Sequence, residues 1–288
     1  MNIINKIKDL AKSFPAEVAL GVSSKCLAYA KKSVRAAEVA FKENLAKPLL
    51  VGEEKVIRSY LKEELKIKDS REPEIDLVHL LSSGMVEGAV RGSLKASKTL
   101  SALRKEFHPS RLFRIGLIET VKGDSFFIAP VGIDEGRTLT EKLDIIVHSV
   151  KFARSLGLAP KVGILSGGRK EDLGRCEVVD KSLAEAEFLA SRAKELKITQ
   201  DIKNYDILIE EALRDKADVI VAPDGISGNL IYRTLIHLGG GSSHGGLMVG
   251  IPKIFIDTSR AAPLEEYVDA IAMASALISQ NKIVEEKR

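Results

Sequence analysis

Short apolar runs rich in β-branched residues alternate with stretches of helical periodicity along most of this chain. Most of these runs are apolar on both faces, as strands are in a parallel sheet that helices cover. The runs that predict strands are 17–22, 47–52, 76–81, 113–120, 125–132, 161–166, 217–223 and 247–257. Strands that alternate with helices predict an α/β fold with right-handed crossover connections.

The stretches between the strands carry helix signals. Apolar residues recur three to four positions apart over 26–41 and again over 139–153. Two predicted helix starts carry the capping-box pattern, Thr138 with Glu141 and Ser182 with Glu185, in which each side chain bonds the other residue's backbone. We therefore expect helices to begin after Thr138 and after Ser182.

One pair of strands breaks the alternation, because 113–120 and 125–132 follow each other with only a short link. Gly123 and Asp124 in that link predict a hairpin, hence an antiparallel pair within the sheet. The stretch that follows, 131–140, is a candidate crossing point between two lobes.

Two lobes with a ligand cleft between them are the expected organisation. The first α/β lobe is predicted to comprise 1–136 and 258–288, and the second 137–257.

Composition excludes several classes of protein. A hydrophobic fraction of 45% over 288 residues can fill a sizeable core. The 44 basic and 40 acidic residues leave a net charge of only +4, which argues against nucleic acid as a partner. Cys26 and Cys176 are too few and too far apart for a disulfide framework or a zinc ribbon. No apolar run reaches membrane-spanning length, so we expect a cytoplasmic protein without a membrane partner.

Common nucleotide, metal and hydrolase motifs do not fit. The glycine run at 238–246 departs from GxGxxG, because His244 stands where the third glycine would follow Gly239 and Gly241. The stretch 163–170 resembles a P-loop but ends in Arg169-Lys170 instead of Lys followed by Ser or Thr. The histidines show no ligand spacing, so no metal site is predicted.

Polar residues follow two predicted strands near the C-terminus. Asp224 follows the strand at 217–223, and Ser227 is expected to cap a helix that starts at Gly228-Asn229, whose free N–H groups attract anions. Ser259 and Arg260 follow the strand at 247–257, where an arginine suits a phosphate or an oxyanion.

These residues also have simpler explanations. Asp224 can hold the turn alone, and Ser227 can be a cap without a ligand role. Glu265 and Glu266 are what any helix start favours, although Glu266 also has the chemistry of a base facing the same site.

The segment 217–280 resembles the C-terminal part of the phosphate acetyl/butyryltransferases. The matching positions are Pro223-Asp224, Gly228-Asn229, Tyr232, Leu238-Gly239-Gly240, Gly245, Gly250, Asp257 and Ser259-Arg260. The resemblance implies a two-lobed, three-layer αβα fold akin to isocitrate and isopropylmalate dehydrogenases. It also implies acyl transfer between coenzyme A and phosphate, with Ser259 and Arg260 at the reacting carbonyl and Glu266 in place of the family's aspartate base.

This chain departs from that family at several positions. The family's DGxxQxDxA signature is absent, and Ala261 replaces a glycine. Lys98 stands where an arginine is expected, unless Arg91 takes that role. His244 stands where those enzymes usually have an apolar residue, which indicates a different ligand.

A resemblance to the methanogen marker protein 4 family, also labelled methyltransferase Mtx subunit X, covers the whole length. It is carried by 84–94, 162–175 and 238–246. In the second of these, Arg169, Lys170 and Arg175 could bind an anion, and the alternative is a solvated loop.

Three functional hypotheses follow. The first is a homodimeric transferase of methanogenic archaea that binds an anionic ligand bearing phosphate or a coenzyme, such as coenzyme A. The second is a non-catalytic subunit that works with a methyltransferase. The third is a methyltransferase itself, for which the sequence shows no methyl-donor motif.

Overall fold

The computed structural model describes residues 2–286, which form two compact units. The first unit comprises residues 1–112 and 243–288, and the second comprises 113–242. Both boundaries fall earlier along the chain than the predicted ones. Strand pairing explains this, because 125–129 joins the sheet of the second unit and 254–257 joins that of the first. The predicted crossing point at 131–140 accordingly lies inside the second unit.

The first unit contains a sheet with strand order β3-β2-β1-β4-β11-β10. All neighbours pair in parallel except β10 and β11, which are antiparallel. Its strands are β1 (Glu17–Gly21), β2 (Lys47–Gly52), β3 (Lys66–Asp69), β4 (Gly88–Val90), β10 (Ser242–Val249) and β11 (Ile254–Asp257). Its helices are α1 (Ile3–Ser13), α2 (Leu27–Lys42), α3 (Glu54–Arg58), α4 (Pro73–Ser82), α5 (Ala96–Phe107) and α10 (Leu264–Glu286).

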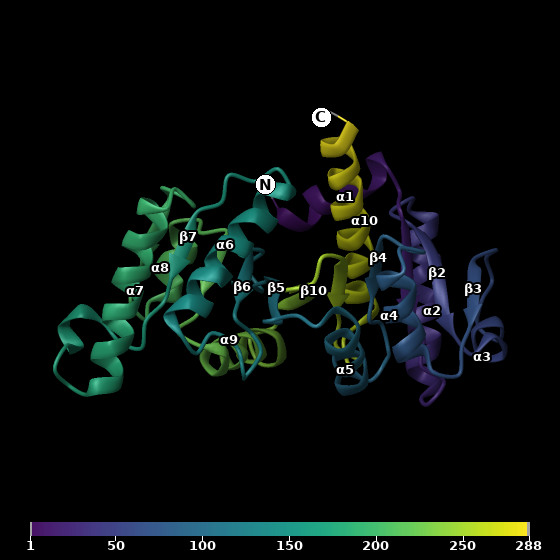
Figure 1. The fold of residues 1–288 in the computed structure, drawn as a ribbon, viewed down its shortest axis with the longest axis horizontal. Coiled ribbons are helices and arrows are strands. Elements are labelled where there is room, and N and C mark those ends of the chain that lie inside the picture. The colour runs from purple at the N-terminus through teal and green to yellow at the C-terminus, as the bar shows by residue number, and fades with distance from the viewer. Residues whose placement is uncertain (1, 287–288) are drawn as a thin grey trace. The chain divides into compact units, whose positions relative to one another are not determined.

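The helix α10 is the central helix of this unit. It packs against α1, α2 and the strands β11, β4 and β1 (Figure 1). Because it has neighbours on all sides, its residues from Glu266 to Ser279 are buried all around the helix. A side chain that is polar within this run, such as Asp269, therefore needs a partner inside the unit. The opposite face of the sheet carries an apolar core with α4 and α5, centred on Leu77, Phe255 and Leu103.

The second unit has strand order β5-β6-β9-β7-β8. The hairpin of β5 and β6 is antiparallel, as the sequence predicts, and Gly123 in its turn has a φ of +84°. The strands are β5 (Phe113–Glu119), β6 (Ser125–Ala129), β7 (Val162–Ile164), β8 (Ile202–Asn204) and β9 (Val219–Val221). The helices are α6 (Leu139–Ser155), the 3-10 turn η1 (Lys170–Asp172), α7 (Glu177–Glu195), α8 (Ile209–Arg214) and α9 (Gly225–His237).

Two of the predicted strands are wrong. The run 76–81 lies in α4, which Pro73 opens at its first turn, with Glu74 and Asp76 near the positive helix end. Its apolar residues line one helix face, and so short a run does not distinguish helix from strand. The run 247–257 is not one strand but a hairpin of β10 and β11, because Gly250 turns the chain with a φ of +107°.

One of the two predicted helix starts is correct. The capping box of Thr138 and Glu141 is present at the start of α6. The helix α7 begins five residues before Ser182, so Ser182 is not a cap, and its hydroxyl accepts a hydrogen bond from the Gly167 N–H (2.9 Å). The capping pattern at Ser182 is therefore coincidental.

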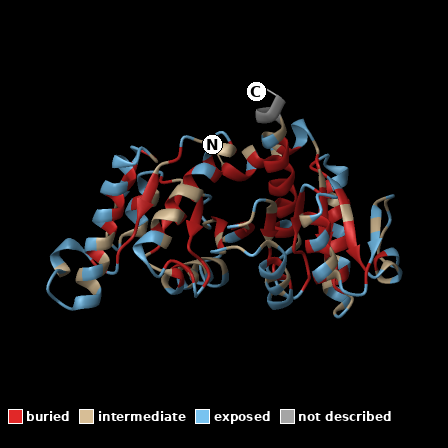
Figure 2. Ribbon diagram, in the orientation of Figure 1, coloured by how far each residue is buried: buried red, intermediate tan, exposed pale blue. Residues whose placement is uncertain are grey.

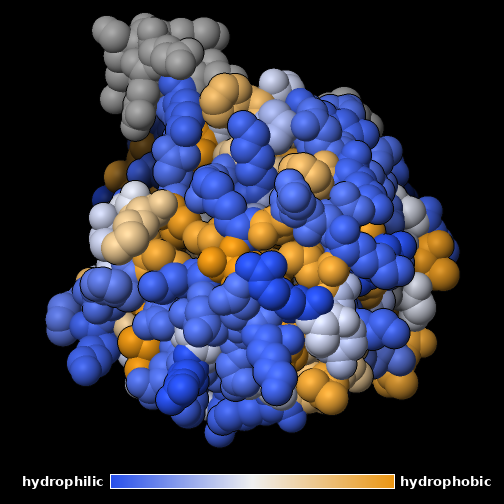
Figure 3. All heavy atoms as spheres, turned by 90° about the vertical axis from the view of Figure 1, so that its right-hand side faces the viewer, coloured by the Kyte–Doolittle hydropathy of each residue, from blue (hydrophilic) through white to orange (hydrophobic). Residues whose placement is uncertain are grey.

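Burial follows these elements within each unit. Figure 2 shows the strands largely buried, while the helices other than α10 expose one face. The face of the first unit that Figure 3 presents is mostly hydrophilic, with apolar areas interrupted by polar side chains. This mixture is ordinary for a protein surface. In the described part of the chain no helix has both the length and the apolar character needed to cross a lipid bilayer.

Candidate functional site

Three neighbouring parallel strands of the first unit end at the same edge of its sheet. The strands β1 and β11 flank β4, with Leu20 and Ile256 both in register with Val90. Each is followed by a loop that leads into a helix, α2, α5 or α10. The carboxyl ends of parallel strands are where α/β proteins place their ligand sites. We call this set of loops, 22–26, 91–95 and 258–263, the strand-end site.

Glycines allow the first two loops to approach each other closely. Gly92 has a φ of +60°, and a Cβ there would overlap the carbonyl oxygen of Gly21. The amide of Ser93 donates to that same carbonyl (3.2 Å). A larger residue at 92 would therefore separate the two loops.

Arg91 is the structural tie of the strand-end site. It is 5% exposed, and its Nε forms an ion pair with Asp257 at the end of β11. Its other nitrogens donate to the carbonyl oxygens of Leu94 (2.7 Å) and Thr258. The guanidinium therefore has partners on all three nitrogens, and it connects two loops. Lys98, the other candidate for the family arginine, is exposed in the first turn of α5.

Ser259 and Arg260 lie exposed on the turn between β11 and α10. Lys32 of α2 holds this turn by donating to the carbonyl oxygens of Arg260 (2.7 Å) and Ala262 (2.5 Å). The Lys32 ammonium also lies 4.6 Å from the centre of the buried Tyr267 ring, a cation–π contact. Burial lowers the pKa of Lys32, opposed by the negative charge of Glu266. The backbone of the turn is thus fixed while its two polar side chains face solvent.

Glu266 supports the same turn from inside the unit. It is 2% exposed, and its Oε1 accepts a hydrogen bond from the Ser259 N–H (2.8 Å). Burial raises the pKa of this carboxyl, and the nearby Asp257 raises it further, while hydrogen bonds from Ser259 and Ser243 act in the opposite direction. Glu265 beside it is exposed. Glu266 therefore has an environment that favours its protonated form.

His244 is buried in a second polar cluster and follows Ser243 on β10, whose side chain bonds Glu266. Its Nδ1 lies 2.6 Å from Asp269 Oδ2, and Lys8 of α1 lies 2.7 Å from the other oxygen of Asp269. Burial alone would raise the pKa of Asp269, but the hydrogen bonds from His244 and Lys8 hold it below its usual value. Asp269 is therefore a carboxylate that orients the imidazole.

The residues predicted at the start of α9 are used locally in the second unit. The helix begins at Gly225, and its N-cap is Asp224, whose side chain accepts from the Ser227 N–H (2.8 Å). The predicted cap at Ser227 and the start at Gly228 are thus corrected, because the aspartate lies three residues ahead of the amide it caps.

Packing also accounts for the two residues that follow. A Cβ on Gly228 would overlap the carbonyl oxygen of Pro130, and the Asn229 side chain donates to the Val131 carbonyl (2.8 Å). The start of α9 is therefore occupied by contacts with the 130–132 segment.

The basic residues after β7 are paired with acids of their own unit. Lys170 lies 3.0 Å from Glu187, Arg175 lies 2.6 Å from Asp172, and Arg169 approaches Glu171 at 4.0 Å. All of these pairs lie on the surface, where solvent weakens them. The ion pairs of this loop therefore agree with the alternative of a solvated surface loop. An anion would have to compete with these carboxylates for the basic side chains.

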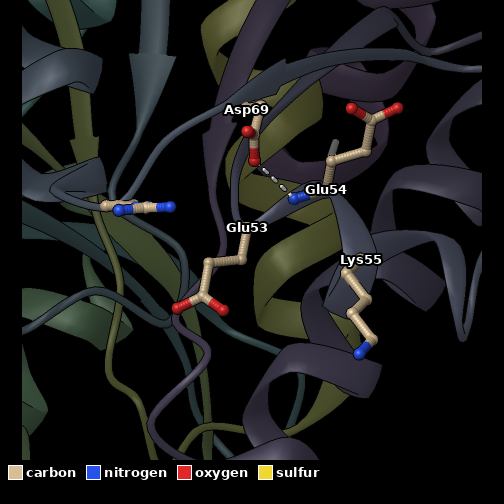
Figure 4. Close-up of a pocket in the computed structure, with 5 residues that line it drawn as sticks. Glu53, Glu54, Lys55 and Asp69 are labelled. Atoms are coloured by element: carbon tan, nitrogen blue, oxygen red, sulfur yellow. Dashed lines mark hydrogen bonds between the residues drawn. The ribbon is translucent and has the colours of Figure 1, made fainter.

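An open pocket of about 650 Å³ lies beside the strand-end site, at the ends of β2 and β3. Glu53, Glu54, Lys55, Asp69 and Arg71 line it, and Asp69 accepts the Glu54 N–H at 2.8 Å (Figure 4). Asp69 thus serves the start of α3, while Glu53 accepts from the Ser24 hydroxyl and Glu54 pairs with Arg58. Among residues 2–282, whose side chains the structure describes, no three His, Cys, Asp or Glu side chains are grouped to hold a metal ion.

Lys8, Lys32 and Asp269 are parts of this region that sequence reasoning missed. Asp269 follows Glu266 by three residues, so both face one side of α10. An aspartate within an otherwise apolar helix stretch was a signal that could have been used. The two lysines carry no comparable signal, because lysines are common throughout the chain.

Comparisons with known proteins match both resemblances seen in the sequence. The profile of the family described as "Phosphate acetyl/butaryl transferase" matches residues 73–275. A Methanosarcina barkeri protein named "Putative methyltransferase mtx subunit X" is 42% identical over 272 residues, covering 94% of this chain and 97% of its own. A phosphate butyryltransferase of Clostridium acetobutylicum is 27% identical, covering 84% of this chain and 88% of its own.

Solved structures agree on the fold. The EutD phosphotransacetylase from Staphylococcus aureus has a TM-score of 0.74 at 19% identity, covering 95% of this chain and 97% of that one. At this identity the likeness concerns the fold, and it confirms the predicted phosphotransacetylase-like α/β class.

Proposed function

This chain belongs to the phosphate acetyl/butaryl transferase family, and from this we propose that it is a group-transfer enzyme acting on an anionic ligand. The ligand bears a phosphate or a coenzyme such as coenzyme A. It binds at the strand-end site of the first unit, against Ser259 and Arg260.

The observation that carries this proposal is the construction of the Ser259–Arg260 turn. Three side chains hold the backbone of this turn. Arg91 donates to the Thr258 carbonyl, and Lys32 donates to two further carbonyls. Glu266 accepts a hydrogen bond from the Ser259 N–H. The exposed side chains of Ser259 and Arg260 are left over for a ligand. A fixed backbone with free polar side chains is what pre-organised binding requires.

The chemistry of each group suits acyl transfer. The Arg260 guanidinium would stabilise the negative charge that develops on the oxygen of a reacting carbonyl. Ser259 would donate a hydrogen bond to the same group. Glu266, with its raised pKa, would take the proton of an attacking thiol, which at its ordinary pKa near 8.5 is mostly protonated at neutral pH.

An assay of acyl transfer tests this proposal directly. Acetyl phosphate and butyryl phosphate are offered with coenzyme A, and thioester formation is measured for the natural protein, Arg260→Ala, Glu266→Gln and the control Glu265→Gln. We expect Arg260→Ala and Glu266→Gln to lose about 100-fold or more in kcat, as removal of an oxyanion donor or a base does. The proposal fails if the natural protein shows neither turnover nor a ligand-induced rise in Tm with any of these compounds.

A second candidate function is a subunit that works with a methyltransferase of methanogens. The 42% identity to the protein named as subunit X favours it, as do the departures at Lys98, Ala261 and His244. Under this alternative Arg260→Ala would abolish complex formation and leave the partner's methyl transfer without this subunit unchanged. If the chain is itself the methyltransferase, calorimetry must detect binding of S-adenosylmethionine or of a corrinoid protein. We place either function in the cytoplasm, in a homodimer.

A further inference from the structure

Buried polar side chains gather where β10 packs against α10. Glu266 and Asp269 lie on one face of α10, and Ser243 and His244 lie on β10 opposite them. All four are at most 6% exposed. Burying this many polar groups in one place is costly unless each has a partner.

The charged groups around this cluster have partners of opposite charge, except for Glu266 and His244. Arg91 pairs with Asp257 of β11, and Lys8 of α1 pairs with Asp269. Lys32 of α2 donates hydrogen bonds to two carbonyl oxygens. Its ammonium interacts with the Glu266 charge from more than ion-pair distance. Within residues 2–282, no cation lies at ion-pair distance from the Glu266 carboxylate. His244 must share an aspartate that Lys8 already neutralises.

The orientation of His244 shows which of its nitrogens is available. Because Asp269 is a carboxylate, Nδ1 of His244 is the donor in their 2.6 Å contact. In the neutral ring Nε2 is then an acceptor. Among the described residues this buried Nε2 has no hydrogen-bond partner. A buried imidazole oriented by a carboxylate, with its second nitrogen available, is suited to receive a proton.

We propose that Glu266 and His244 form one electrostatically coupled pair, which holds a single proton in the free protein, on one group or the other, and accepts a second one when an anionic ligand binds. The ligand part of this inference rests on the proposed function, whereas the pairing in the free protein does not. With one proton the pair carries no net charge, and burial favours this uncharged state.

The second proton comes from the nucleophile of the substrate. The X–H bond of a thiol or hydroxyl group breaks, its electron pair stays on X, and the proton passes to the pair. The pair then carries one positive charge, which offsets the negative charge of the ligand at the strand-end site. His244 thus adds proton capacity that a carboxylate alone would not supply.

The pairing is tested first without any ligand. Carbon-13 NMR follows the Glu266 carboxyl through a pH titration in the natural protein and in His244→Asn, whose amide keeps the donor to Asp269 but lacks Nε2. We expect the midpoint of Glu266 to rise by about one pH unit in the variant, because a nearby positive charge is lost. His148→Asn, in the second unit, is the matched control and should change nothing. An unchanged Glu266 midpoint in His244→Asn overturns the pairing.

The ligand part is tested by the ionisation of the bound thiol. Ultraviolet absorbance measures the thiolate fraction of coenzyme A bound to the protein near neutral pH, without acetyl phosphate so that no turnover occurs. We expect the thiolate fraction seen with the natural protein to be lowered at least twofold in His244→Asn. Equal thiolate fractions in both proteins overturn this part alone. Absence of binding to the natural protein overturns the proposed function and leaves the NMR result to decide the pairing.

Discussion

The strand-end site of the first unit and the start of α9 in the second unit carry the same kind of sequence signal. Each has polar residues after a buried strand and before a helix, with glycines nearby. At α9 the polar groups are used by the fold, because Asp224 caps the helix and Asn229 bonds the Val131 carbonyl. At the strand-end site, buried residues secure the backbone and leave Ser259 and Arg260 exposed. The two regions therefore differ in whether polar side chains remain unused by the fold.

The largest expected effect on stability comes from replacing Arg91, which connects two loops of the strand-end site. Arg91→Met removes the ion pair with Asp257 and the hydrogen bonds to the Leu94 and Thr258 carbonyl oxygens, and we expect a loss of about 3–5 kcal/mol in the free energy of unfolding. Urea denaturation measures it. The exposed Arg260→Ala is the matched control, expected to change stability by less than about 0.5 kcal/mol. Equal effects from both arginines would contradict the distinction between a structural and an exposed arginine.

The packing at the start of α9 is tested by adding a methyl group. Gly228→Ala should lower stability by about 2 kcal/mol, because its Cβ overlaps the Pro130 carbonyl oxygen. Gly167→Ala is a suitable comparison, since a Cβ there meets the nearest atom at 3.4 Å, an ordinary contact. If Gly228→Ala retained full stability but lost ligand binding, the start of α9 would be a ligand site after all.

A smaller effect is expected from the helix cap. Asp224→Ala removes the acceptor of the Ser227 N–H and should cost about 1 kcal/mol in thermal or urea unfolding. Ser227→Ala should cost less, since its hydroxyl is not the cap. The reverse order would restore Ser227 as the capping residue.

The smallest effect is a pH dependence of stability at Glu266. Burial raises the pKa of this carboxyl in the folded protein above its usual 4.5. The resulting stabilisation is fully present below about that pH and is lost as the pH rises through the raised value. Glu266→Gln does not suffer this loss, so its Tm relative to the natural protein should increase with pH. A difference in Tm that is constant with pH would show that the carboxyl titrates normally.

Local patterns predicted the elements well where several signals agreed. The hairpin at Gly123 and the capping box of Thr138 are present, because turn and cap chemistry involve only nearby residues. The errors at 76–81 and 247–257 arose where an apolar run fitted both helix and strand, or contained a turn. Arg91, Ser259, Arg260 and Glu266 were all singled out from sequence and meet in the first unit, although their catalytic roles stay predictions.

What the sequence by itself determined is the α/β class, the family, and the polar residues that end the last strand. Only the tertiary structure decided which of them hold the fold together and which are left exposed. The ties that make this distinction join Arg91 to Asp257, Lys32 to Arg260 and Lys8 to Asp269, pairs far apart in the chain. Their formation depends on strand order and on the burial of α10 on all sides, and no local periodicity records either of these.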